Sequence, residues 1–200
     1  PVHGNAHVIT LCVHKEFGVQ DNPRNSLCKD GWRFIPVELI DLPGLIKGAW
    51  EGKGLGNQFL SVAAQSDVLL HIVDASGSID ASGKIAEAGA GDPIADVSDI
   101  EEELVLWYLK LFEGNREKIS RMTNTGMDTA RAITEIFGGI GVKEWHVKQS
   151  IVENNLADRN IHELDPDESR KFISTLREIS KPSLIVANKI DLPTAAENFN

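Results

Sequence analysis

Residues 37–56 read Val37-Glu-Leu-Ile-Asp41-Leu-Pro-Gly44-Leu-Ile-Lys-Gly-Ala-Trp-Glu-Gly-Lys-Gly-Leu-Gly56. A short apolar run ends in Asp41, and the fifteen residues that follow it contain five glycines. This pattern predicts a strand that delivers a carboxylate to a mobile, ligand-contacting loop. A carboxylate at a strand end can hold a magnesium ion through water, and a glycine three residues later lets a backbone N–H approach a terminal phosphate.

A second motif, Asn188-Lys189-Ile190-Asp191, follows the apolar run of residues 184–187. An Asn-Lys-x-Asp match arises by chance in only about one chain in thirty of this size. An aspartate carboxylate accepts hydrogen bonds from the ring N–H and the exocyclic amine of guanine, whereas adenine offers it an acceptor and no matching donor. Because an unpaired carboxylate against the wrong base is costly, the motif indicates a sharp choice of base.

The Asp-x-x-Gly pattern alone is weak evidence, since it starts at Asp41, Asp74 and Asp80. The longer stretch of residues 41–57 distinguishes the match at Asp41 from the other two, because it closely resembles the switch II signature of Obg-family GTPases. With the helical segment and the late Asn-Lys-x-Asp motif, the chain is similar to the YchF-type branch of that family, in its archaeal form. The likeness covers almost the entire chain and is specific at the switch.

The resemblance implies roles for three residues of the first motif. Asp41 would organise magnesium through water, Gly44 would sense the terminal phosphate, and the loop of residues 47–56 would move between states. Leu45 occupies the position where Ras-like GTPases carry the glutamine that orients the attacking water. Slow intrinsic hydrolysis is therefore the hypothesis, with the water positioned by other groups.

The resemblance also assigns the second motif. Asn188 would support the base and its loop, the stem of Lys189 would pack along the base plane, and Asp191 would select guanine. Some YchF-type proteins have a changed motif and prefer ATP. Because Asp191 is retained, GTP is the predicted ligand, and an ATP-preferring enzyme stays open as the alternative.

One part of the family pattern is missing from the sequence. No Gly-x-x-x-x-Gly-Lys-Ser/Thr phosphate loop occurs, although residues 48–54 and 77–84 are near misses. In relatives, a phosphate loop precedes the region that begins here, and a C-terminal domain follows. We therefore expect a fragment that lacks both flanks and is inactive as a GTPase alone. The other interpretation is a gene product that has lost phosphate binding.

The local patterns predict an α/β fold with an interruption. Strands are expected over residues 7–14 and 34–40 as a long-looped antiparallel hairpin, and over 68–73 as a strand buried on both faces. The resemblance implies a P-loop NTPase-like, mostly parallel sheet with this hairpin at its edge. Expected helices cover residues 57–65, a segment opened by a capping box at Ser98 and Glu101, 115–137, 143–154, and a segment capped by Asp165.

These elements predict three parts along the chain. Residues 1–92 form the first part of the nucleotide-binding domain, residues 93–180 an all-helical insertion, and residues 181–200 the second part with the base motif. A different class of function remains open, in which the insertion is a non-hydrolysing interaction module on a degenerate domain.

Composition excludes several classes of protein. The net charge of −10 argues against DNA binding by the chain as a whole, and the run Glu101–Glu103 is predicted to be a solvated helix face. Neither a signal peptide nor an apolar run of membrane length occurs. The expected partners are a guanine nucleotide and, through regions outside this chain, the ribosome.

The cysteine usage indicates a reduced, cytoplasmic setting. Only Cys12 and Cys28 are present, which is too few for a disulfide framework. His3, His7 and His14 lie nearby in the sequence, but their spacing fits no zinc pattern. Magnesium at Asp41 is therefore the one metal ion that the sequence predicts.

Overall fold

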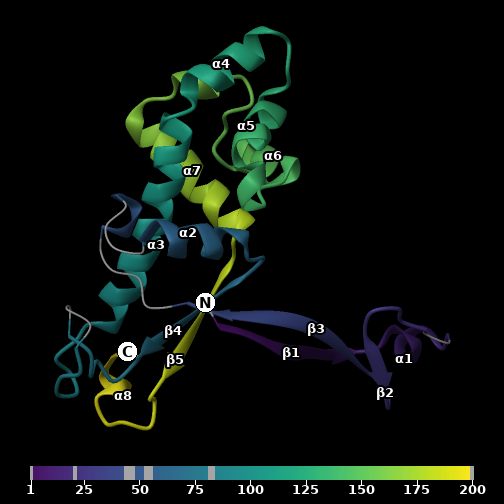
Figure 1. The fold of residues 1–200 in the computed structure, drawn as a ribbon, viewed down its shortest axis with the longest axis vertical. Helices are drawn as coiled ribbons and strands as arrows, with labels where there is room; N and C mark the ends of the chain where they lie inside the picture. Colours follow the sequence, from purple (N-terminus) through teal and green to yellow (C-terminus); the bar gives the residue numbers. More distant parts are fainter. Residues whose placement is uncertain (1, 20–21, 43–47, 52–55, 81–83, 199–200) are drawn as a thin grey trace. The chain divides into compact units, whose positions relative to one another are not determined.

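The computed structural model describes residues 2–19, 22–42, 48–51, 56–80 and 84–198 (Figure 1). The chain forms two compact units, Pro1–Gly44 and Leu45–Asn200. Within the described residues, no helix combines the length and the apolarity that crossing a membrane would need.

The first unit is a three-stranded antiparallel sheet in the order β1-β3-β2. The strands are β1 (Val2–Leu11), β2 (Leu27–Lys29) and β3 (Trp32–Asp41), and the short helix α1 (Val13–Phe17) follows β1. Pairing of β1 with β3 runs from Val2 opposite Asp41 to Leu11 opposite Trp32, which confirms the predicted hairpin. Asp30 and Gly31 join β2 to β3 with φ angles of 52° and 82°, as a type I′ turn requires.

The first strand ends earlier than its alternating pattern predicts. The backbone N–H of Cys12 donates to the carbonyl of Gly31 at 2.9 Å, and the carbonyl of Cys12 accepts from Lys15 N at 3.0 Å. The second bond turns the chain into α1, so Val13 continues a helix instead of the strand.

The second unit contains a parallel strand pair. Strand β4 (Leu69–Asp74) pairs with β5 (Ser183–Asn188), the helix α2 (Gly56–Gln65) precedes β4, and α8 (Ala195–Asn198) follows β5. The expectation that β4 is buried on both faces is wrong, because Leu70 and Ile72 are 51% and 65% exposed. Among the described residues β4 has only β5 as a strand neighbour, and Val73 is the one apolar side chain of β4 that is buried.

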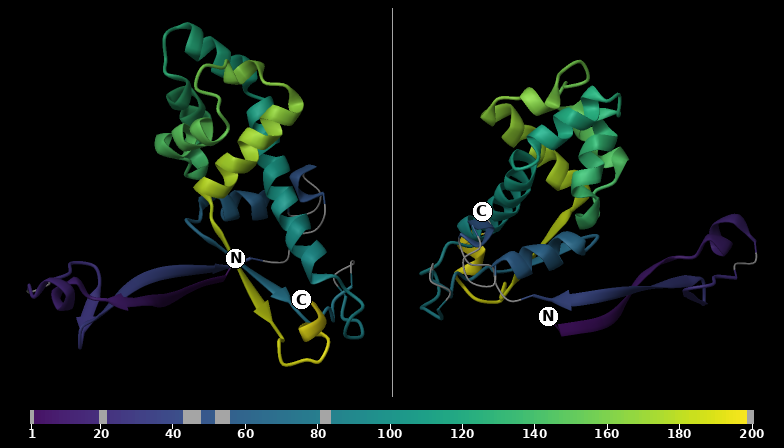
Figure 2. Two further views of the ribbon diagram at one scale, coloured as in Figure 1. Left: turned by 180° about the vertical axis from the view of Figure 1, so that it is seen from behind. Right: turned by 45° about the horizontal axis from the view of Figure 1, so that its top comes forward.

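Five helices connect β4 to β5: α3 (Pro93–Glu113), α4 (Arg116–Asn124), α5 (Thr129–Phe137), α6 (Glu144–Glu153) and α7 (Pro166–Ser180). Short 3₁₀ turns are η1 (Ala49–Glu51), η2 (Gly138–Ile140) and η3 (Ile161–Glu163). Helices α4–α7 lie at the end of the unit where β5 begins, and α8 lies where β5 ends (Figures 1 and 2). Their shared core is built on the fully buried side chains of Tyr108, Phe112, Phe137, Phe172 and Ile133. Helices α3–α7 thus share a hydrophobic core.

Two helix boundaries differ from the sequence prediction. Helix α3 begins at Pro93, because the Asp92 carboxylate accepts the first free N–H groups of the helix, and the predicted start at Ser98 is wrong. The helix predicted over residues 115–137 is two helices, since the chain turns at Gly126, whose φ is 92°. The predicted N-cap at Asp165, with proline in the first turn, is confirmed.

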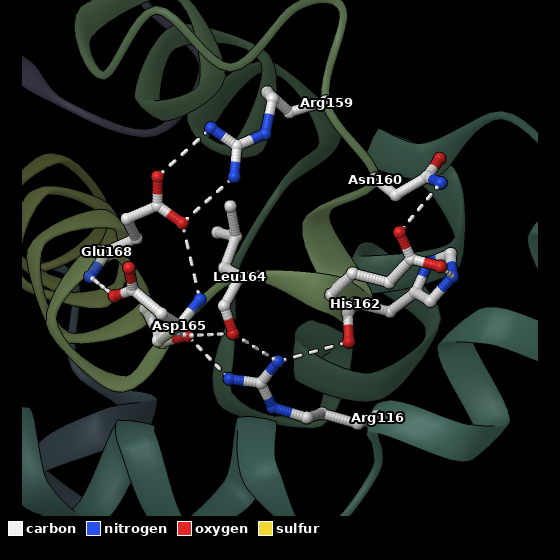
Figure 3. Close-up of polar contacts among 9 residues, drawn as sticks. Arg116, Arg159, Asn160, His162, Leu164, Asp165 and Glu168 are labelled. Atoms are coloured by element: carbon white, nitrogen blue, oxygen red, sulfur yellow. Dashed lines mark hydrogen bonds and ion pairs between the residues drawn. The ribbon is translucent and has the colours of Figure 1, made fainter.

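Arg116 ties the start of α4 to the segment before α7 (Figure 3). Its Nη1 donates to the carbonyl oxygens of His162 and Leu164 at 3.0 and 2.9 Å, and its Nη2 donates to Ser169 Oγ at 2.5 Å. The guanidinium also pairs with Glu113 one turn earlier. This one side chain therefore satisfies polar groups that the loop leaves without secondary-structure partners.

We expect Arg116→Ala to lower the free energy of unfolding by about 2 kcal/mol, because carbonyls in a partly buried loop lose a charged donor. Urea unfolding followed by circular dichroism measures the change. Arg121→Ala is the matched control, since Arg121 makes one exposed 3.4 Å bond to Glu117 O; it should change stability by less than about 0.5 kcal/mol. Equal effects of the two substitutions would contradict the assignment.

Candidate functional site

The parallel register of β4 and β5 brings two polar residues together where both strands end. Asp74 is the last residue of β4 and lies opposite Asn188, the last residue of β5. The carboxyl ends of parallel strands are where α/β folds bind ligands. The Asn188–Asp191 motif therefore leaves the sheet at the edge where a ligand is expected.

Asp74 is held by four hydrogen bonds. Its Oδ1 accepts from the N–H and the hydroxyl of Ser76 at 3.1 and 2.6 Å. Its Oδ2 accepts from Ser78 Oγ at 2.5 Å and from Lys189 Nζ at 2.9 Å. Burial of the carboxyl raises its pKa, but the hydrogen bonds from Ser76, Ser78 and Lys189 outweigh burial and hold the pKa of Asp74 well below its usual range. The group is an anion at neutral pH.

Lys189 is fixed at both its backbone and its side chain. Its φ of 59° lies in the left-handed region, which is unusual for a residue with a side chain. The backbone N–H donates to Asn188 Oδ1 at 2.9 Å, and Nζ donates to Ser78 Oγ at 2.9 Å in addition to Asp74. The carbonyl of Asn188 accepts from Ala75 N at 3.0 Å. Two of the three predicted base-motif residues are thereby positioned, and Asp191 follows them with an exposed side chain.

The loop after β4 is fastened to the chain that follows the motif. Thr194 Oγ1 donates to the carbonyl of Ser76 at 2.9 Å, and Asn198 Nδ2 donates to that of Ala75 at 2.8 Å. Glycine is required within this loop, because a Cβ built on Gly91 would lie 1.9 Å from the carbonyl oxygen of Ile79. The two loops of the site therefore form one bonded assembly.

The first motif is represented in this unit by residues 48–51. The buried carboxylate of Glu103 on α3 accepts from Gly48 N at 2.5 Å and from Trp50 N at 3.0 Å. Lys110 Nζ donates to the Trp50 carbonyl at 3.3 Å and lies 5.9 Å from the centre of its ring. Helix α3 thus holds residues 48–50 of the glycine-rich segment through two side chains, Glu103 and Lys110, that lie two helical turns apart.

The prediction that Glu101–Glu103 is a solvated face is wrong for Glu103, which is 5% exposed. Glu101 pairs with Arg177 and Glu102 with Arg170, both on α7. The sequence shows only three adjacent acids, and the fold gives each a different partner.

The remaining predicted residues divide between the two units. Asp41 is the last residue of β3 in the first unit, opposite Val2, and its side chain is exposed. Gly44 and Leu45 lie outside the described residues. Asn188, Lys189 and Asp191 belong to the second unit. Sequence reasoning missed Asp74, although its Asp-x-x-Gly match after an apolar run was a signal.

Comparisons with known proteins agree with this arrangement. The sequence profile of a family described as "50S ribosome-binding GTPase" matches residues 10–106. An uncharacterized GTP-binding protein of Methanocaldococcus jannaschii is 37% identical over 199 residues, covering 100% of this chain and 49% of that protein. The ribosome-binding ATPase YchF of Bacillus subtilis is 30% identical over 156 residues, covering 76% of this chain and 38% of that protein.

A solved structure is similar over nearly the whole chain. The crystal structure of a GTP-binding protein from Pyrococcus horikoshii OT3 matches with a TM-score of 0.74 and 28% identity, covering 94% of this chain and 50% of that one. These similarities place the chain with the Obg-like GTPases. The predicted α/β class is confirmed, and the fold is GTPase-like. The chain spans about half the length of the Methanocaldococcus jannaschii and Pyrococcus horikoshii proteins.

In this GTPase-like unit, the ion pair of Asp74 gives an expected pH dependence. Because the folded pKa of Asp74 is depressed, its contribution to stability is present above the unfolded value of about 3.9 and is lost as pH falls toward the folded pKa. The difference in unfolding free energy between the natural chain and Asp74→Asn should stay constant from pH 7 to about 5 and shrink below about 4. Urea unfolding at a series of pH values measures it, and a constant difference down to pH 3 would contradict the account.

Proposed function

We propose that this chain is the base-reading and switch-bearing part of an Obg/YchF-type protein that binds GTP and hydrolyses it slowly as a switch. The observation that carries the proposal is the Asn188–Asp191 motif at the carboxyl end of a parallel strand pair. Its first two residues are fixed by contacts with β4 and the loop after it, and Asp191 is exposed to solvent. An exposed carboxylate on a fixed loop is suited to receive the two donors of guanine.

Each residue of the motif has a role in this proposal. Asp191 accepts hydrogen bonds from the base, and Asn188 keeps the loop in register with β4 through the bond to Ala75. The charge of Lys189 is neutralised by Asp74, which leaves its methylene stem to pack along an apolar base plane.

Asp41, Gly44 and Leu45 keep the roles that the family resemblance implies. The exposed carboxylate of Asp41, at the end of a strand, is the oxygen donor that magnesium prefers and fits a water-mediated site. When bound, magnesium would neutralise charge on the phosphates. Gly44 would contact the terminal phosphate, and Leu45 would leave the attacking water without a glutamine to orient it.

Glu103 supports the switch part of the proposal. Because the Glu103 carboxylate accepts hydrogen bonds from Gly48 and Trp50, a movement of the glycine-rich loop would be transmitted to α3 through these two bonds. Helix α3 contributes Tyr108 and Phe112 to the core of the helices, so the loop is joined to the whole helical part. A nucleotide-dependent loop position would therefore alter the surface that these helices present to a partner.

The family description and the printed name of the Bacillus subtilis relative support the ribosome as that partner. The same relative is named an ATPase, which keeps an ATP-preferring enzyme as the second candidate. Asp191 favours GTP over ATP, because guanine offers its carboxylate two hydrogen-bond donors and adenine does not.

Single-turnover hydrolysis of radiolabelled GTP by the complete gene product tests the switch. We expect stoichiometric binding with magnesium and a slow rate without a partner, since Leu45 stands where a water-orienting glutamine would act. A fast rate in the absence of any partner would refute slow intrinsic hydrolysis, and failure of the complete protein to bind either nucleotide would refute the proposed function.

A further inference from the structure

Three potential metal ligands meet in the first unit, far from the base motif in sequence. Cys12, His14 and Cys28 offer two sulfur atoms and one ring nitrogen that all lie within 4.8 Å of one another. Cys28 Sγ and His14 Nδ1 are 3.2 Å apart. Neither cysteine is in a disulfide.

Three elements bring these residues together. Cys12 occupies the N-cap position of α1, and its backbone N–H donates to the carbonyl of Gly31 in the β2–β3 turn. His14 lies in the first turn of α1, and Cys28 is the central residue of β2. Because Asp30 and Gly31, both in the left-handed region, set the register of β2, the cluster depends on a turn that lies sixteen and seventeen residues after His14. No local spacing pattern could have revealed it.

The distances suit a tetrahedral ion. With Zn–S bonds of about 2.3 Å and Zn–N bonds of about 2.0 Å, ligand atoms in a tetrahedral zinc site are about 3.5–3.8 Å apart. The Cys28–His14 distance is close to this value, and the other two spacings, which are within 4.8 Å, need a change of about 1 Å or less, which side-chain rotation supplies. A ligand set of two thiolates and one imidazole binds zinc in preference to magnesium or calcium.

Little apolar side-chain surface is buried around the cluster in the part of the first unit that the structure describes. Among the residues of the first unit that the structure describes, Cys12 is the one apolar side chain that is fully buried. Phe17, Leu27 and Trp32, which surround the cluster in the sequence, are 68%, 61% and 47% exposed. Segments with so little core are commonly held by a metal or a disulfide.

We propose that Cys12, His14 and Cys28 bind one Zn²⁺ ion, with a water molecule as the fourth ligand. Binding displaces the two thiol protons to solvent, and His14 coordinates through Nδ1 as the neutral ring. The ion joins the end of β1, helix α1 and the β2 strand, so its role is to hold the tip of this sheet together. This proposal does not depend on nucleotide binding, so its test is independent of the test of the proposed function.

Cobalt substitution in the 200-residue chain, purified under reducing conditions without chelator, tests the site. Titration with Co²⁺ should give the visible d–d bands of a tetrahedral site and a thiolate charge-transfer band, both saturating at one equivalent, and Zn²⁺ should abolish them. Cys28→Ser and His14→Ala should each lower the apparent affinity by at least about 100-fold, beyond what loss of a supporting hydrogen bond costs.

His7→Ala is the matched control, since His7 lies on β1 outside the cluster and packs edge-on against Phe34; it should bind Co²⁺ like the natural chain. The dispersion of the amide NMR signals of β1 and β3 shows whether the first unit of each variant is folded, which the circular dichroism of the second unit's helices would not report. In addition, bound zinc should protect the partly exposed Cys28 thiol from alkylation, and a chelator should remove that protection. Absence of the cobalt bands, equal binding by Cys28→Ser, or a Cys12–Cys28 disulfide under reducing conditions would overturn the proposal.

Discussion

Asp191→Asn is expected to lower the preference for GTP over ATP by about 100-fold or more. The carboxylate accepts from two donors of guanine, and hydrogen bonds to a charged group contribute about 1.5–3 kcal/mol each. The amide keeps one acceptor but turns an N–H₂ donor toward a donor of the base, so one bond is lost and a repulsive pair replaces it. Competition of unlabelled nucleotides against a fluorescent guanine nucleotide, with magnesium, measures the change.

Glu197→Gln is the control for Asp191→Asn, because it removes one exposed negative charge from α8 without touching the motif. It should leave the preference for GTP over ATP within about twofold of the natural value, since salt screens the charges of solvent-exposed side chains such as Glu197. An unchanged preference in Asp191→Asn would show that another group reads the base.

Glu103→Ala is expected to destabilise the second unit by about 3 kcal/mol. The substitution leaves the N–H groups of Gly48 and Trp50 without their acceptor, and each buried unpaired donor costs about 1–3 kcal/mol. Urea unfolding measures the loss. Hydrogen exchange adds a local readout, because the amides of Gly48 and Trp50 should lose protection at low urea while those in α7 keep theirs.

Glu102→Ala is the matched control for Glu103→Ala. Glu102 is the adjacent acid on α3, and it pairs at the surface with Arg170. Exposed ion pairs contribute about 0–1 kcal/mol, so this variant should stay close to the natural chain in stability and in exchange at Gly48. If the two variants behave alike, Glu103 does not anchor the loop.

The sequence predicted those helices and strands whose limits are set by residues close to one another in the chain. The alternation that places Ile9 and Leu11 on one side predicted the first strand of the antiparallel hairpin, and Asp165 with Pro166 predicted the start of α7. Ser98 misled because a stronger start, Asp92 with Pro93, lies six residues earlier. Helix ends were least predictable, since a single residue such as Gly126 can break a segment that reads as continuous.

The site contacts that the sequence did not reveal join residues distant along the chain. Asp74 reaches Lys189 across the strand pair, and Glu103 reaches Gly48 across the fold. Cys28 meets His14 only because the β2–β3 turn fixes the register between them. Motif spacing identified Asn188, Lys189 and Asp191 because these neighbours act as a unit, whereas their supporting residues required the three-dimensional arrangement.

The most direct test of the account is a competition between GTP and ATP, measured on this chain and on the protein with whatever further residues its gene encodes. With magnesium and a fluorescent guanine nucleotide, we predict that the complete protein binds and that GTP displaces the probe at concentrations at least about 100-fold lower than ATP does. Equal displacement by the two nucleotides, or displacement by ATP alone, would contradict the role given to Asp191 and the assignment of a GTP-reading site.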